Sequence, residues 1–129
     1  MATLATREQI LGIEDAEYRD VEVPQWNGLV VRLKALTALE RDRFDGTMTT
    51  GRGKNVKVNW EHARARLIVA TAVDEKGEPL FTHKDIEALS QKNAAAVDVL
   101  FAAAQELCGI TNRDIEDLAG NLKSSRSEE

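Results

Sequence analysis

A hairpin pattern that leads directly into a capped helix constrains the fold of this chain most strongly. Apolar and polar residues alternate over 21–23 and again over 31–35, which is typical of strands with one buried face. Asn27-Gly28 lies between the two runs and favours a short type I′ turn, since both central positions of that turn need a positive φ. Pro24 cannot donate to a ladder, so it belongs on an edge. The sequence predicts a β-hairpin over about 21–35.

Helix starts recur along the rest of the chain. Thr37 and Glu40 have the spacing of a capping box, in which each side chain satisfies a free backbone amide of the other residue. The same Thr-x-x-acid or Thr-x-x-Gln spacing begins at Thr6, Thr82 and Thr111. We therefore expect an α+β fold, mainly α, in which the hairpin precedes a bundle of about four to five helices. The longer helices are predicted from Thr37 to about Gly46, from Asn59 to about Asp74, and from Asn93 to Gly109.

The apolar periodicity predicts which helix faces are buried. Trp60, Ala63, Leu67 and Ala70 recur at three and four residues and are expected to face the core. The cleanest stripe runs over 97–108 and predicts the central helix. Residues 1–120 are predicted to form a single domain, and the polar tail 121–129 is predicted to be disordered. Gly and Pro within 74–79 predict a tight exposed turn.

Length and composition narrow the class of protein. The chain has 129 residues, of which 43% are hydrophobic and 30% are charged, a balance typical of one soluble globular domain. No segment approaches the roughly 18 uninterrupted apolar residues of a membrane span. The N-terminus lacks the basic flank and apolar run of a signal peptide, so we expect the chain to stay in the cytosol. Cys108 has no second cysteine to pair with and is expected to be a small buried side chain.

Side chains suited to catalysis or metal binding are sparse. His62 and His83 are far apart and belong to no zinc-binding motif, and both are expected on polar, solvated helix positions. Gly51-Arg52-Gly53-Lys54 resembles a phosphate-binding loop only superficially, because Asn55 stands where the loop needs a hydroxyl. The sequence predicts no catalytic site, no cofactor and no metal.

A basic segment stands out against an acidic chain. The net charge is −5, yet residues 41–66 carry seven lysines and arginines against three acids, a local net charge of +4. Within it, 47–58 is predicted to be a mobile surface loop, with Val56 and Val58 as a possible short strand. Arg52, Lys54 and Lys57 are candidates for docking an acidic partner or nucleic acid. Ordinary solvation is the stronger alternative, and the acidic remainder argues against nucleic acid.

Four stretches in a fixed order carry a family resemblance. They are V-E-V-P-Q-W-N-G-L-V-V-R-L-K-A-L-T-A-L-E-R-D-R-F, then R-A-R-L-I-V-A-T-A-V-D-E-K-G-E-P-L-F, D-I-E-A-L-S-Q-K-N-A-A-A-V and E-L-C-G-I. Together they resemble the tail assembly chaperones of long-tailed, siphovirus-type bacteriophages and prophages. The resemblance extends over Val21 to Asn121, and it rests on the order and spacing of the pieces rather than on any one of them.

The resemblance implies a non-enzymatic protein of the infected cell. Such a protein binds the tape-measure protein, keeps it soluble while the tail tube polymerises, and is absent from the mature virion. Its partners are the tape-measure protein and other phage tail proteins. In many members a programmed frameshift near the end of the short frame yields a longer product, and codons GCG-GGA-AAC for Ala119-Gly120-Asn121 would supply a slippery site. Self-association is also open, with no number of subunits fixed.

A client helix needs an apolar face to lie on. Leu80, Phe81, Ile86 and Leu89 are candidates for the rim of such a face, although plain core packing is the stronger alternative for them. Two other classes of protein stay open: a structural head-to-tail connector or minor tail component, and a nucleic-acid-binding regulator that uses the basic loop.

Overall fold

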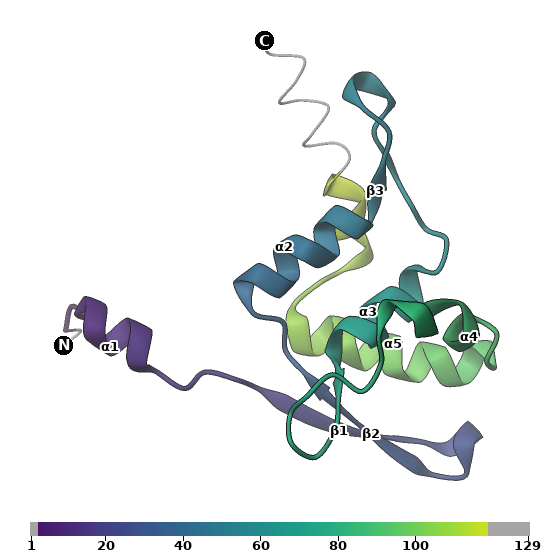
Figure 1. Ribbon diagram of the computed structural model, residues 1–129, viewed down its shortest axis with the longest axis horizontal. Coiled ribbons are helices and arrows are strands. Elements are labelled where there is room, and N and C mark those ends of the chain that lie inside the picture. Colours follow the sequence, from purple (N-terminus) through teal and green to yellow (C-terminus); the bar gives the residue numbers. More distant parts are fainter. Residues whose placement is uncertain (1–2, 119–129) are drawn as a thin grey trace.

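The predicted hairpin is present and lies along one side of the molecule (Figure 1). The computed structural model describes residues 3–118. Strands β1 (Tyr18–Val23) and β2 (Leu29–Lys34) pair antiparallel, with Val23 opposite Leu29. Val23 and Leu33 are fully buried on the inner face, as the alternating pattern requires. The α+β, mainly α, architecture is confirmed.

The turn of this hairpin is longer than predicted. A 3₁₀ turn over Pro24–Trp26 precedes Asn27 and Gly28, which have positive φ angles of 57° and 75°. The backbone amide of Gly28 donates to the carbonyl of Val23 at 3.1 Å and closes a five-residue connection. The prediction of positive φ was correct, but the two-residue turn was wrong. Proline favours the first position of a helical turn, so Pro24 extends the connection and stands just outside the edge strand.

A third strand, which the sequence pattern did not predict, completes the sheet. Strand β5 (Ala72–Val73) pairs antiparallel with Arg32 and Leu33, giving the order β1-β2-β5. Helix α3 (Ala63–Thr71) therefore ends at Thr71 and not near Asp74. The backbone beyond β5 turns back on itself, and the amide of Leu80 donates to the carbonyl of Ala72 at 3.0 Å.

The start of α3 also differs from the prediction. His62, with a φ of 59°, precedes the first helical residue and supplies no side-chain cap. Asn59 is not the cap, since it lies four residues before the first helical residue. Its amide donates to the carbonyl of Met48 at 2.7 Å and ties this segment to the end of α2. Trp60 is 45% exposed, and Ala70 is exposed as well. The buried face of α3 is formed by Ala63, Ala65, Leu67, Ile68 and Thr71.

The other predicted helix boundaries largely agree with those in the structure. Helix α2 (Ala38–Thr47) opens with both hydrogen bonds of the Thr37–Glu40 capping box. The Thr82 cap opens a 3₁₀ turn (His83–Asp85) that leads into α4 (Ile86–Ser90). Asn93 caps α5 (Ala94–Cys108), which ends at Gly109 with a φ of 67°. A last helix, Asn112–Leu118, follows the Thr111–Asp114 cap.

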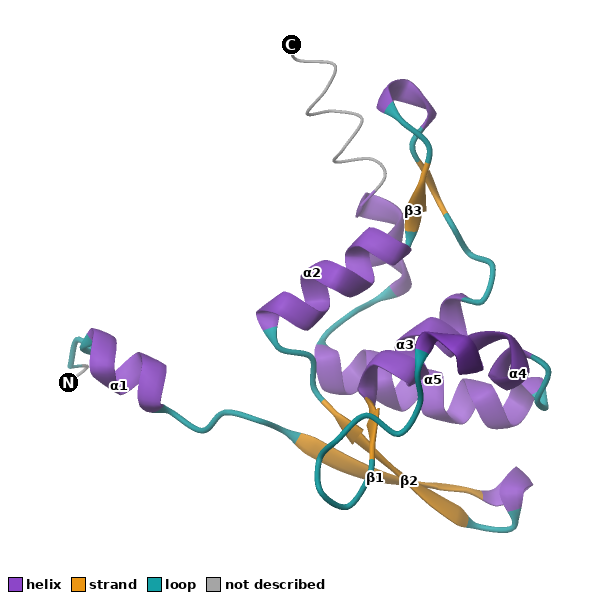
Figure 2. Ribbon diagram, viewed as in Figure 1, coloured by secondary structure: helices purple, strands orange, loops and turns teal. Residues whose placement is uncertain are grey.

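Helix α5 organises the core. It packs on one side against β1 and β2 and on the other against α3, which in turn contacts α4 and α2 (Figure 2). Apolar side chains from all of these elements meet in one cluster. Its largest fully buried members are Leu33, Met48, Leu67, Ile68, Leu100, Ile110 and Ile115.

Two segments project from this body. Residues 47–58, predicted as a mobile surface loop with a possible short strand at Val56 and Val58, form a small hairpin of β3 (Thr49–Thr50) and β4 (Lys57–Val58) joined through a 3₁₀ turn (Gly53–Asn55). The short strand is present, and it includes Val58 but not Val56. Val56, which directly follows this 3₁₀ turn, is buried. At the other end, helix α1 (Arg7–Gly12) opens with the predicted Thr6 capping box but buries no residue. The predicted disordered tail, 121–129, lies outside the described residues.

Candidate functional site

An apolar groove lies between α2, α3 and the segment that follows β5. It has a volume of about 500 Å³ and is open to solvent. Residues of α3 and β5 form one wall, α2 forms the second, and the chain from Gly77 to Ile86 forms the third. We call this feature the apolar groove. Its floor consists of Phe44, Val69, Ala70, Ala72, Val73, Pro79 and Ile86.

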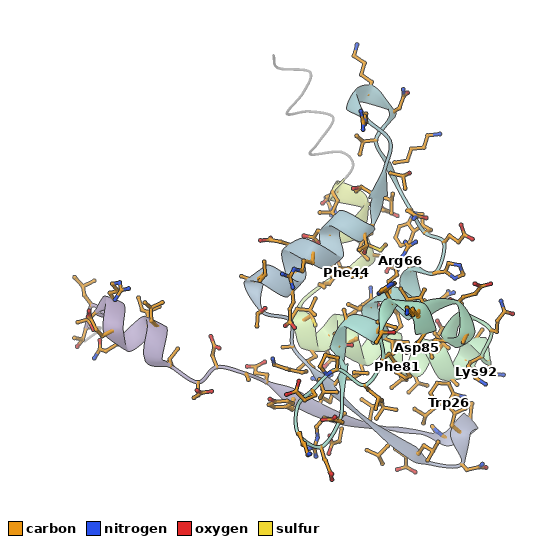
Figure 3. All side chains as sticks on the ribbon, viewed as in Figure 1. Trp26, Phe44, Arg66, Phe81, Asp85 and Lys92 are labelled. Atoms are coloured by element: carbon orange, nitrogen blue, oxygen red, sulfur yellow. The ribbon has the colours of Figure 1, made fainter. Side chains whose placement is uncertain are left out.

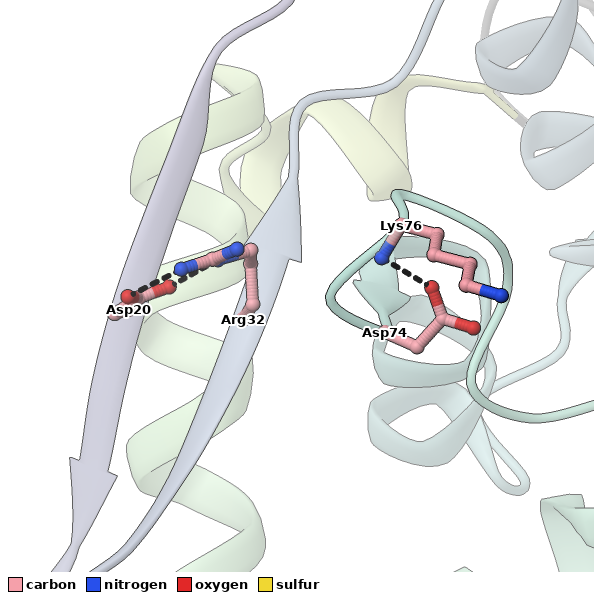
Figure 4. Close-up of polar contacts among 4 residues, drawn as sticks. All are labelled: Asp20, Arg32, Asp74 and Lys76. Carbon is pink, nitrogen blue, oxygen red and sulfur yellow. Dashed lines mark hydrogen bonds and ion pairs between the residues drawn. The ribbon is translucent and has the colours of Figure 1, made fainter.

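The turn behind β5 gives the groove its third wall. The carboxylate of Asp74 accepts from the backbone amide of Lys76 at 2.8 Å (Figure 4) and from that of Glu78 at 3.0 Å. Gly77 has a φ of 82°, which glycine adopts without strain. Together these contacts hold Pro79 against β5, where it forms a bridge with Val73. The tight turn predicted over 74–79 therefore has a structural role at this site.

Cations dominate the rim of the groove. Lys34, Arg43 and Arg66 line it, and the guanidinium of Arg66 donates to the carbonyl of Asn59 at 3.2 Å. Figure 3 shows Arg66 on α3 close to Phe44 on α2. Glu40 is the one carboxylate among the lining residues, and it already accepts from the amide of Thr37 at 2.9 Å. An apolar floor with a positively charged rim suits an apolar segment that carries acidic residues at its edges.

The four predicted apolar contact residues do not lie together on one surface. Ile86 lines the groove. Leu80 directly follows the groove residue Pro79 and is 48% exposed, but it does not line the groove. Phe81 is half-buried against the core, and Leu89 is only 7% exposed and belongs to the core. Leu89 is therefore not accessible to a partner, and the alternative interpretation as core describes it better.

Sequence reasoning missed most of the groove. Arg66, Val69 and Ala70 follow the three- and four-residue spacing of a second stripe on α3, beside the face that packs into the core, whereas Ala70 was predicted to face the core. That spacing was a signal available in the sequence. No such signal marks Phe44 and Pro79, because they approach this stripe only through tertiary packing.

The predicted basic residues gather on the β3–β4 hairpin. Arg52, Lys54 and Lys57 are all exposed, and within residues 3–118 they form no ion pair. Gly51 has a φ of 91°, and a Cβ there would collide with the carbonyl oxygen of Asn55. The hairpin therefore presents cations on a defined backbone, and it projects from the body of the molecule beyond the end of α2 (Figure 1). Other cations of the basic segment are neutralised: Arg41 pairs with Asp45, and Arg64 pairs with Asp98.

A histidine and a serine form a contact that the sequence did not predict. His62 Nδ1 lies 2.7 Å from Ser90 Oγ, and His62 Nε2 lies 3.5 Å from a carboxylate oxygen of Glu61. In a Ser-His-acid triad the serine contacts Nε2 and the acid contacts Nδ1, so the order here is reversed. The side chain of Glu61 is 79% exposed. The contact joins the start of α3 to the end of α4, and His62 is not the solvated helix residue that was expected.

The described part of the chain offers little basis for metal binding, thiol reactivity or membrane spanning. Within residues 3–118 no group of three or more His, Cys, Asp or Glu side chains is placed to hold a metal ion. Cys108 is partly buried, and burial raises the pKa of its thiol. No single helix in this range is long and apolar enough to cross a bilayer. Helices α5 and Asn112–Leu118 reach that composition only together, and they are bent by 73°.

The fold and the groove define a small α+β protein with an open apolar groove on its surface. Residues 6–121 match the family model described as phage tail assembly chaperone. The chain therefore belongs to the phage tail assembly chaperone family. Its fold is similar to that of the tail assembly chaperone of bacteriophage HK97, with a TM-score of 0.55 at 18% identity over 78% of this chain and 88% of that chain. No curated protein matches the sequence.

Proposed function

We propose that this protein binds the tape-measure protein of its phage and keeps it soluble while the tail tube assembles. The observation that carries this proposal is the apolar groove with its cationic rim, found in a chain of the tail assembly chaperone family. A groove of this shape accepts the apolar face of an amphipathic helix. The client segment is then a helix with an apolar stripe and acidic flanks.

The chemistry of the groove supports binding and not turnover. Its lining contains aliphatic and aromatic carbon, three cations, Thr47, His83 and a glutamate that is already engaged in a helix cap. His83 is exposed, and it forms no side-chain hydrogen bond or ion pair within residues 3–118 that would orient it as a base. Each aliphatic side chain that a client buries there contributes roughly 1.5–3 kcal/mol, before the cost of association is subtracted. We infer a non-enzymatic protein that needs no cofactor and acts by covering apolar client surface.

We further propose a place of action for the protein. It works in the cytoplasm of the host cell with the tape-measure protein and other tail proteins, and it is not retained in the finished particle. A longer product arises if ribosomes slip at the Gly120 and Asn121 codons, which lie outside the described residues. Silent recoding of these two codons removes the longer band from an immunoblot of the natural gene with its downstream DNA. A single band before recoding contradicts the frameshift.

Co-expression with the tape-measure gene of the same phage tests the chaperone role. Ala70 lines the groove, is exposed and lies on α3, so Ala70→Glu places a charge in the groove without disturbing the core. Ala102 is an equally suitable control, because it is exposed on α5 and outside the groove. Wild type and Ala102→Glu should keep the tape-measure protein in the soluble fraction, and Ala70→Glu should not. Equal solubility with all three, or insolubility with all three, contradicts the proposal.

A further inference from the structure

The N-terminal arm, residues 3–17, exposes a set of large apolar side chains that its own chain does not cover. Helix α1 buries no residue, and the arm extends away from the body of the molecule (Figure 1). The exposed fractions are 94% for Leu4, 59% for Ile10, 68% for Leu11 and 64% for Ile13. Clustered apolar exposure of this kind marks an interaction surface.

The arm also has a defined local structure that lacks tertiary support. Both hydrogen bonds of the Thr6–Gln9 capping box are formed, at 2.9 and 3.2 Å, so the sequence specifies a helix start. A helix of six residues is nevertheless marginal in water, because one nucleation cost is spread over few hydrogen bonds. An amphipathic helix so short is stabilised chiefly by packing its apolar side against another surface.

Charge identifies which surface of this protein suits the arm. The arm contains Glu8, Glu14, Asp15 and Glu17 against Arg7, whereas the rim of the apolar groove carries Lys34, Arg43 and Arg66. The groove volume of about 500 Å³ lies in the range of sites that receive ligand side chains. Apolar and charged parts of the arm thus match apolar and charged parts of the groove.

We propose that the arm of one copy docks in the apolar groove of a second copy of this chain. The arm leaves its own domain from a fixed point, where the amide of Ala35 donates to the carbonyl of Glu17 at 2.9 Å and Tyr18 pairs with Lys34. From that point it runs outward and away from its own α2 and α3 (Figure 1). Docking into a second copy covers the apolar residues of the arm and fills the groove in one step.

Cysteine cross-linking between differently labelled chains tests which groove the arm enters. In a Cys108→Ala background, one chain carries Ile10→Cys in the arm and the other carries Ala70→Cys in the groove. The mixture should form a disulfide-linked heterodimer under mild oxidation. Replacing Ala70→Cys by Leu29→Cys, which is 63% exposed on the hairpin, should abolish it. No heterodimer, or the same yield with Leu29→Cys, overturns the proposal. So does a cross-link found only within monomers of a chain that carries both Ile10→Cys and Ala70→Cys.

Analytical ultracentrifugation of the full chain provides the second measurement. Ile10→Asp with Leu11→Asp should raise the dissociation constant of self-association at least about tenfold, since both side chains lose apolar burial. The matched control is Leu29→Asp with Val30→Asp, whose positions are 63% and 61% exposed on β2. An equal effect of both pairs, or no self-association of the wild type, contradicts the proposal. Neither experiment contains the tape-measure protein, so failure here is distinct from failure of the proposed function.

Discussion

Arg32 on β2 holds Asp20 on β1 through two parallel hydrogen bonds, from Nε to Oδ1 at 2.7 Å and from the terminal nitrogen to Oδ2 at 3.0 Å (Figure 4). The two residues are direct partners in the strand register. A bidentate pair of this geometry adds support on the exposed face to the register that the buried face already specifies.

This pair makes hairpin stability depend on pH. The hydrogen bonds from Arg32 hold the pKa of the Asp20 carboxyl below its ordinary value of 3.8. A folded-state pKa that is lowered contributes stability above the ordinary value, and that contribution is lost as the pH falls through the lower folded value. Asp20→Asn should therefore lower Tm at neutral pH and have less effect at about pH 2. Thermal unfolding followed by circular dichroism at both pH values measures this, with the exposed Asp42→Asn as the control. An equal effect of Asp20→Asn at both pH values contradicts the assignment.

The His62–Ser90 contact positions α4 beside the groove. Ser90 ends α4 and Ile86, which lines the groove, begins it. Ser90→Ala removes one partly buried hydrogen bond and should lower the free energy of unfolding by about 1 kcal/mol. Urea unfolding measures this difference. His62→Ala combined with Ser90→Ala should destabilise the fold by less than the sum of the two single changes, since both remove the same bond; full additivity would show that the contact contributes nothing.

Leu80 and Leu89 should respond very differently to truncation. Leu89 is 7% exposed within the core, so Leu89→Ala should cost roughly 2–5 kcal/mol of unfolding free energy. Leu80 is 48% exposed, and Leu80→Ala should stay within about 0.5 kcal/mol of wild type. Denaturant titration of both variants checks the assignment of one residue to the core and the other to the surface. Similar costs for the two would place both in the same environment.

If the arm and the client share the apolar groove, the arm should compete with the client. Deleting residues 1–13 removes α1, which buries nothing, so the fold should be unaffected. The apparent affinity for a tape-measure segment should then rise at protein concentrations above the self-association constant and stay unchanged below it. Fluorescence anisotropy at two protein concentrations separates these cases. A loss of affinity at both concentrations would mean that the arm helps to bind the client.

Local chemistry explains which parts of this fold the sequence predicts. The caps at Thr6, Thr37, Thr82 and Asn93 each involve residues within three positions of one another, so their spacing alone identifies them. Strand β5 consists of two residues that pair with Arg32 and Leu33, about forty positions earlier, and no local pattern marks it. The start of α3 also depends on a non-local contact: the amide of Asn59 donates to the carbonyl of Met48, just beyond the end of α2, and the helix begins only at Ala63.

The groove was harder to predict than the fold. Its residues come from β2, α2, α3, β5, the turn after β5 and α4, and only the α3 stripe is visible as a spacing. Apolar residues such as Ile86 and Leu89 look alike in the sequence. Which of them faces the groove and which the core depends on how α4 rests on α3.

Direct binding of tape-measure segments to the purified chain tests the central claim most closely. Labelled peptides that cover the tape-measure protein are titrated with wild type, Ala70→Glu and Ala102→Glu, and anisotropy is recorded. We predict that at least one amphipathic segment with acidic flanks binds wild type and Ala102→Glu equally. Ala70→Glu should bind it at least about tenfold more weakly, because a carboxylate then lies against apolar client surface. Equal affinity of Ala70→Glu and wild type, or no binding of any segment by wild type, would contradict the assignment of the apolar groove as the client site.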